Sequence, residues 1–173
     1  MSSSAPSLAA AGSLVMSPTP RGKHVGTIRR LRRQLESRLP SGTAAYEVTS
    51  VGMPDDPDDY ATPDLVLLPD EWDEGDAWLA DPADAVLAGE AISQSEKARD
   101  IGQKDGWYAV AGVAALLVID PRHGTWAPYA RPESGSYQER SGGKFGEDVP
   151  LPEPPALVVA TDSFPRYGTG AVG

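Results

Sequence analysis

Apolar residues recur at helical spacing in two parts of the chain, and these parts predict its two main helices. The first covers residues 23–39, where the arginines lie mostly on the opposite side. Its apolar positions are Val25, Ile28, Leu31, Leu35 and Leu39. The second covers residues 96–112, and Gly112 is a natural end for it. Both helices are long enough to cover a sheet.

Strand-like patterns fill most of the remaining chain. Three continuous apolar runs, residues 64–68, 85–92 and 114–120, predict strands that are buried on both faces. Shorter strands are expected at residues 12–17, 44–53, 125–130, 136–140, 144–145 and 156–160. The acidic stretches 54–59 and 69–84 are expected to be surface loops.

This order of elements predicts an α/β fold with a mixed central sheet, two main helices and a C-terminal β-hairpin extension. Residues 12–165 form one domain in this interpretation, because 173 residues are enough for one buried core. Residues 1–11, rich in Ser and Ala, are expected to be a disordered tail. Residues 166–173, rich in Gly, are expected to be a flexible tail.

The composition excludes several classes of protein. Without cysteine there are no disulfides and no thiolate metal sites, and the two histidines argue against a histidine-based zinc site or a Ser-His-Asp triad. No apolar run approaches the length of a membrane span, and the first residues lack the positive charge of a signal peptide. We therefore expect a cytoplasmic protein.

The charge is strongly asymmetric along the chain. The net charge of −10 argues against nonspecific coating of nucleic acid. However, 7 of the 15 Lys and Arg residues fall within residues 21–38, whereas none falls within 40–96, which holds 15 of the 25 acids. The basic helix can be a solvated face that balances an acidic neighbour. It can also be one edge that binds nucleic acid.

Two acids and a lysine form the strongest candidate site. Asp64 opens one buried strand, and Glu90 lies inside another, where an unpaired carboxylate would cost several kcal/mol. Lys104 shares the apolar stripe of the second helix and can reach Glu90. Asp64 and Glu90 would offer hard oxygen ligands to Mg²⁺, with Lys104 orienting the attacking water and stabilising the phosphate charge. A turn role for Asp64 and a structural Glu-Lys pair remain open alternatives.

Four further residues are candidate accessory groups. Asp100 lies one helical turn before Lys104. An Asp-Lys pair at this spacing commonly contributes only a weak electrostatic interaction on the helix surface. Ser93 can touch a phosphate or cap the helix, and capping is the simpler explanation. His24 can bind phosphate or transfer a proton, although a histidine at a helix end is usually exposed. Tyr108 lies on the same helix stripe as Lys104.

The ordered spacing of these residues resembles the Uma-two family of restriction-type endonucleases, in the PD-(D/E)xK nuclease superfamily. The matching segments are Gly12 to Pro20 with His24, Pro63-Asp64-Leu65-Val66, Glu90 with Ser93 and Ser95, Asp100-x-x-x-Lys104-x-x-x-Tyr108, Ala111-Gly112-Val113 and Leu117 to Pro121. The resemblance covers residues 12–165. It implies a restriction-endonuclease-like core.

The same resemblance implies an activity and its parts. The activity is metal-dependent hydrolysis of DNA phosphodiesters, with Mg²⁺ or Mn²⁺ as cofactor and a homodimer as a common assembly. Asp64 and Glu90 match the metal ligands, and Lys104 replaces the lysine that many relatives carry where this chain has Ile92. Gln94 and the absence of an acid just before Gly12 depart from the pattern. An inactive binding or regulatory module with a nuclease fold is therefore the alternative.

Overall fold

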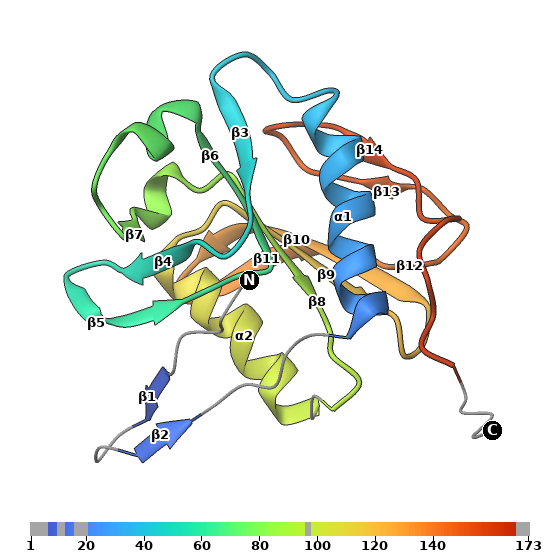
Figure 1. Cartoon of the computed structure of the whole chain (residues 1–173), viewed down its shortest axis with the longest axis horizontal. Helices are drawn as coiled ribbons and strands as arrows, with labels where there is room; N and C mark the ends of the chain where they lie inside the picture. The colour runs from blue at the N-terminus through green and yellow to red at the C-terminus, as the bar shows by residue number, and fades with distance from the viewer. Residues whose placement is uncertain (1–6, 10–12, 16–20, 96–97, 169–173) are drawn as a thin grey trace.

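The computed structural model describes residues 7–9, 13–15, 21–95 and 98–168, with 7–9, 13–15 and 98–101 described by their backbone alone (Figure 1). Its two helices in this part of the chain are α1 (Gly22–Glu36) and α2 (Ala98–Ala111). Both were predicted from apolar periodicity. Within the described residues, neither is long and apolar enough to cross a membrane.

A mixed sheet forms the centre of the molecule, as the sequence predicted. Its strand order is β11-β10-β9-β8-β6-β3, and β12 pairs with β10. Strands β8 and β9 are parallel, whereas the other neighbours are antiparallel. The bounds are β3 (Thr43–Tyr46), β6 (Leu65–Pro69), β8 (Leu87–Ala91), β9 (Ala115–Asp120), β10 (Thr125–Glu133), β11 (Ser136–Arg140) and β12 (Gly143–Lys144).

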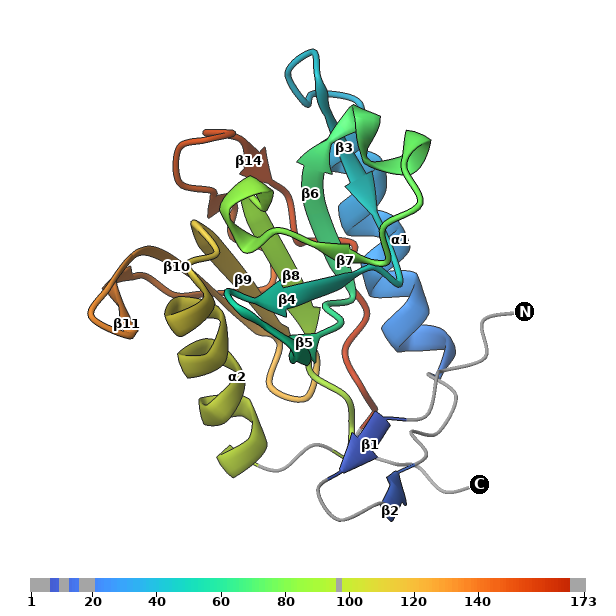
Figure 2. The same cartoon turned by 90° about the vertical axis from the view of Figure 1, so that its left-hand side faces the viewer.

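Both faces of the central sheet are covered, and this explains why β6, β8 and β9 are almost continuously apolar. Alternate residues of each strand point to opposite faces. Leu65 and Leu117 pack with α1 residues, whereas Val66 and Leu116 pack with Tyr108 of α2. Figure 2 shows α1 and α2 on opposite sides of the sheet. The core is thus two layers divided by these strands.

The predicted strand 44–53 is wrong as one unit, because the chain breaks into two strands that belong to different sheets. β3 joins the main sheet, and β4 (Ser50–Met53) joins a three-stranded sheet of order β5-β4-β7. Val48 lies between them with a φ of 53°, in the left-handed region that an extended strand cannot contain. Strand β4 therefore leaves the plane of β3.

The acidic stretches are also more ordered than the predicted loops. Asp56–Ala61 forms β5, paired with β4, so the prediction of a loop over 54–59 is wrong there. As an edge strand β5 tolerates Pro57 and exposed aspartates, which discourage further pairing. The second stretch holds the 3₁₀ turns η1 (Asp70–Glu74) and η2 (Pro82–Asp84) and the strand β7 (Leu79–Ala80).

Short strand pairs lie near both chain ends. Ser7–Ala9 forms β1, paired with β2 (Ser13–Val15), and the tail expected over residues 1–11 stays a prediction. Near the other end, β13 (Val149–Pro150) pairs with β14 (Val158–Val159). Of the predicted C-terminal tail, residues 166–168 are described and residues 169–173 lie outside the described residues.

Tyr167, assigned to the flexible tail from the sequence, is buried. Its backbone N–H donates to the carbonyl of Pro121 at 2.9 Å, and its hydroxyl donates to the carbonyl of Ile92 at 2.8 Å. The C-terminal segment therefore crosses the end of the sheet, connecting the turn after β9 with the residues after β8. A tyrosine among glycines was the sequence signal of this anchor.

We expect Leu31→Ala to destabilise the fold by about 2–5 kcal/mol, because Leu31 is fully buried between α1 and the sheet. Val25→Ala on the same helix is the matched control. Val25 was predicted to lie on the apolar face but is 50% exposed, so its loss should cost less than about 0.5 kcal/mol. Urea unfolding measures both. Equal free energies of unfolding for the two variants would contradict the packing of α1.

Candidate functional site

Strands β6 and β8 bring the two predicted acids together. The strands are antiparallel, and Leu65 pairs with Gly89, so one further step places Asp64 opposite Glu90. Residues opposite each other in such a pair project to the same face, with Cβ atoms about 4.5–5.5 Å apart. The face is the one covered by α2, because Glu90 contacts Tyr108 there. The two carboxylates therefore face one another at the end of the strands.

Asp64 is held by contacts from two other elements. Its Oδ2 accepts a hydrogen bond from the backbone N–H of Ala91 at 2.8 Å. Its Oδ1 lies 3.0 Å from Nε2 of His24, near the start of α1. The Asp64 side chain remains 25% exposed, so a substrate can still approach it. Asp64 thus contacts both β8 and α1.

Glu90 is held between α2 and the sheet. The hydroxyl of Tyr108 donates to Oε1 at 2.7 Å, and Nζ of Lys104 lies 3.4 Å from Oε2. Lys104 keeps 42% of its side chain exposed, whereas Glu90 keeps 10%. The apolar stripe predicted for the second helix thus places Lys104 next to Glu90, and the Lys104 side chain remains partly exposed to solvent.

The carboxyl of Glu90 is difficult to ionise in this position. Burial, the largest cause, raises its pKa to about 7, and the nearby negative charge of Asp64 adds to this rise. Lys104 and the hydrogen bond from Tyr108 act in the opposite direction. The same burial, together with Glu90, raises the pKa of Tyr108 well above its usual value, so the phenol keeps its proton.

These properties fit a divalent cation. Two facing carboxylates provide hard oxygen donors, and a bound cation would relieve the repulsion that raises the pKa of Glu90. Within the described part of the chain, no cluster of three or more His, Asp or Glu side chains is arranged around a metal position. Mg²⁺ does not require one, since it usually retains several waters and binds one or two carboxylates.

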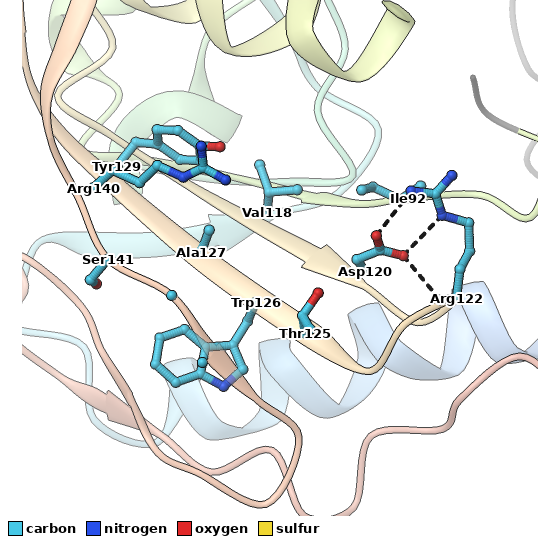
Figure 3. A pocket seen from close by; sticks show the side chains of 12 residues that line it. Ile92, Val118, Asp120, Arg122, Thr125, Trp126, Ala127, Tyr129, Arg140 and Ser141 are labelled. Carbon is cyan, nitrogen blue, oxygen red and sulfur yellow. Dashed lines mark hydrogen bonds and ion pairs between the residues drawn. The ribbon is translucent and has the colours of Figure 1, made fainter. Parts of the chain in front are cut away.

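A groove of about 640 Å³ opens on the sheet; its lining includes Ile92, two residues after Glu90, but not Asp64, Glu90 or Lys104. Val118, the β9 partner of Glu90 in the strand register, lies on its floor. Figure 3 shows Asp120 and Arg122 together at one end, and Tyr129 with Arg140 at the other. The Arg140 guanidinium lies 5.1 Å from the centre of the Tyr129 ring. The volume is typical of small-ligand sites, so the groove can hold part of a substrate.

The accessory candidates are placed unequally. Ser93 is half-buried just after β8. This position is consistent both with a phosphate contact and with a helix cap. Asp100 lies in α2, but its side chain is outside the described residues. Tyr108 binds Glu90 directly.

His24 is the residue that sequence reasoning undervalued. An exposed histidine at the helix end was favoured, whereas its side chain is 12% exposed and its ring contacts Asp64. The contact joins positions 40 residues apart in the chain, which no local pattern indicates. His123, given no role from the sequence, lies 3.0 Å from Oδ2 of Asp120.

The facing carboxylates lie in a mixed α/β fold, and the class of this fold follows from a family comparison. A family model described as "Putative restriction endonuclease" matches residues 8–161. The chain therefore belongs to this family, named Uma2. Asp64, Glu90, Lys104 and the accessory candidates all lie within the matched residues.

A solved structure supports the fold. A crystal structure of "a putative nuclease belonging to DUF820" from Anabaena variabilis matches with a TM-score of 0.68 at 18% identity, covering 89% of this chain and 86% of that chain. A structure of the DrdV–DNA complex matches with a TM-score of 0.34 and 12% identity, over 68% of this chain and 12% of that chain. A search of curated proteins found no match. The first likeness shows that both chains share one fold.

We expect Glu90→Gln to change how stability depends on pH. The folded-state pKa of about 7 lies above the ordinary value of 4.5, so the folded protein binds this proton more tightly than the unfolded chain. The resulting stability is fully present below about pH 4.5 and is lost as the pH rises through 7, by up to roughly 3 kcal/mol. Glu90→Gln should remove this loss, as measured by urea unfolding between pH 4 and 8.

The control is Glu133→Gln, because Glu133 is largely exposed and should leave the pH profile unchanged. A Glu90→Gln profile parallel to that of the wild type would show that Glu90 ionises normally in the folded protein.

Proposed function

We propose that this chain is a DNA endonuclease that requires Mg²⁺ or Mn²⁺ and hydrolyses phosphodiester bonds. Asp64 and Glu90 are its metal ligands, and Lys104 is its catalytic cation. The observation that carries the proposal is the meeting of two facing carboxylates and one lysine amine from three separate elements, at the border of solvent. The PD-(D/E)xK pattern, which the family resemblance implies, likewise combines two carboxylates with one lysine.

The metal, when bound, would polarise the scissile phosphate and lower the pKa of a water ligand. Asp64 and Glu90 would hold it, and the backbone carbonyl of Ala91, next to Glu90, is the candidate third donor. Asp64 is already oriented for this, because Ala91 and His24 fix both of its oxygens. Each carboxylate oxygen retains a further lone pair after one hydrogen bond.

Lys104 supplies a positive charge beside the carboxylates. The amine orients the attacking water and stabilises the negative charge that develops on the phosphate oxygens during hydrolysis. Tyr108 acts on the opposite side of Glu90, where its hydroxyl fixes Oε1 and leaves Oε2 toward Lys104. Tyr108 is therefore a positioning residue in this mechanism.

DNA is the substrate class because the family is described as a restriction endonuclease. The groove on the sheet offers space for nucleotides next to the scissile phosphate. Restriction-type nucleases often cut as dimers, and the homodimer predicted from the resemblance stays a prediction for this chain.

We expect Glu90→Ala and Lys104→Ala each to reduce DNA cleavage with Mg²⁺ or Mn²⁺ by at least about 100-fold, because each removes a charged group from the reacting centre. Lys144→Ala is the control, since Lys144 is exposed on β12. Single-turnover cleavage of supercoiled plasmid measures all three. Undiminished cutting by both site variants would contradict the assignment of these residues.

Metal binding tests the site without relying on activity. We expect calorimetry to show Mg²⁺ binding that Asp64→Asn abolishes and that Asp162→Asn, at an exposed position, preserves. Near pH 6.5 binding should release a proton, because the Glu90 carboxyl with a pKa of about 7 must ionise to bind the cation. Repeating the titration in buffers of different ionisation enthalpy counts the released protons.

The result also separates the enzyme from the alternative, an inactive module with a nuclease fold. Mg²⁺ binding that ignores Asp64, or none at all, would favour the inactive module. Binding without any cleavage would leave the metal site in place and contradict the catalytic proposal.

A further inference from the structure

Four segments that are distant in sequence meet at the end of the sheet where β8 stops. They are the start of α1, the residues after β8, the turn between β9 and β10, and the C-terminal segment. Tyr167 joins three of them through Pro121 and Ile92. Nζ of Lys23 donates to the carbonyl of Arg166 at 2.8 Å, and this contact joins the start of α1 to the C-terminal segment. Figures 1 and 2 both show these segments gathered at one end.

Three cations lie on this end, and we name Arg21, Lys23 and Arg166 the basic rim. All three are exposed. Lys23 donates to a backbone carbonyl, and Arg21 donates to the side-chain oxygen of Gln94, so both contacts are with neutral groups. Among the described residues, none of the three forms an ion pair with a carboxylate. The charge of the rim is therefore available to an anion.

The other end of the same helix differs in this respect. Arg32 pairs with Glu36 and Glu47, each at 2.7 Å, so its charge is balanced within the fold. Asp120, the last residue of β9, is held by Arg122 and His123. Internal balance thus applies to Arg32, whereas Arg21 and Lys23 at the start of the helix present their charge to solvent.

The basic rim adjoins the candidate site. Lys23 directly precedes His24, whose ring contacts Asp64. Gln94, the partner of Arg21, follows Glu90 by four residues, and Ile92, which binds Tyr167, lines the groove. An extended anion held on the rim would therefore lie beside the two carboxylates.

A phosphodiester backbone is the anion that suits this arrangement. Its charges are regularly spaced, and Lys and Arg bind it by releasing condensed counterions. The net charge of −10 repels DNA from most of the protein, so a local cluster of cations determines where DNA can approach. We propose that Arg21, Lys23 and Arg166 bind the DNA backbone next to the scissile phosphate and so set the path of the strand. This inference rests on the proposed function.

Binding of duplex DNA to the full chain, measured by fluorescence anisotropy with Ca²⁺ and 50–200 mM salt, tests the rim. The variant combines Arg21→Gln, Lys23→Gln and Arg166→Gln. We expect it to weaken binding at least about tenfold at 100 mM salt. The plot of log affinity against log salt concentration should become less steep by about 2.7, because three phosphate contacts at about 0.9 each are lost.

The matched control combines Arg33→Gln, Arg38→Gln and Arg131→Gln, which are exposed and change the net charge equally. It should bind nearly as the wild type does. A second variant with Arg21→Lys, Lys23→Arg and Arg166→Lys keeps the charges and should recover most of the affinity. This recovery separates lost charge from lost folding, and thermal unfolding of each variant checks the same point.

Equal losses in the rim variant and in the control, or a wild-type chain that does not bind DNA, would overturn the inference. DNA binding that depends on the rim, in a protein that never cleaves, would leave the inference standing and contradict the proposed endonuclease.

Discussion

The arrangement of this site depends on one constraint, the burial of the Glu90 carboxylate in the central sheet opposite a second acid. Burial alone would keep Glu90 protonated, and Asp64 adds to that tendency. Tyr108 and Lys104 offset part of the cost from α2. The balance leaves a carboxyl with a pKa of about 7, which a cation can shift completely to the ionised form. A group balanced in this way is typical of functional sites.

The rest of the fold holds these groups in place. The antiparallel register of β6 and β8 sets Asp64 against Glu90, and the packing of α1 on the opposite layer brings His24 to the end of β6. Tyr167 fastens the C-terminal segment across the same end of the sheet. The contact of Lys23 with the carbonyl of Arg166 and the anchoring of Tyr167 together place Arg166 beside the start of α1.

Positive and negative charges gather in different parts of this protein, which the net charge of −10 does not reveal. The acidic β5 edge and the 3₁₀ turns belong to the small sheet and its neighbours, whereas the groove opens over β9 and β10 and the rim lies at the start of α1 and on the C-terminal segment. In Figure 1 β5 lies on the left, whereas the start of α1 and the C-terminal segment lie on the right. A nucleic acid would therefore meet attraction along one edge and repulsion elsewhere.

The sequence by itself determined the two helices and the buried strands of the mixed sheet, because apolar periodicity is a local signal, and it singled out Glu90 as a charged residue inside an apolar run. It failed at residues 44–61, where a turn at Val48 with positive φ sends the chain into a second sheet. Only the tertiary structure decided the contacts of His24 with Asp64 and of Tyr167 with Ile92. These contacts join residues 40 and 75 positions apart, and such pairs depend on how the layers pack rather than on any neighbouring residues.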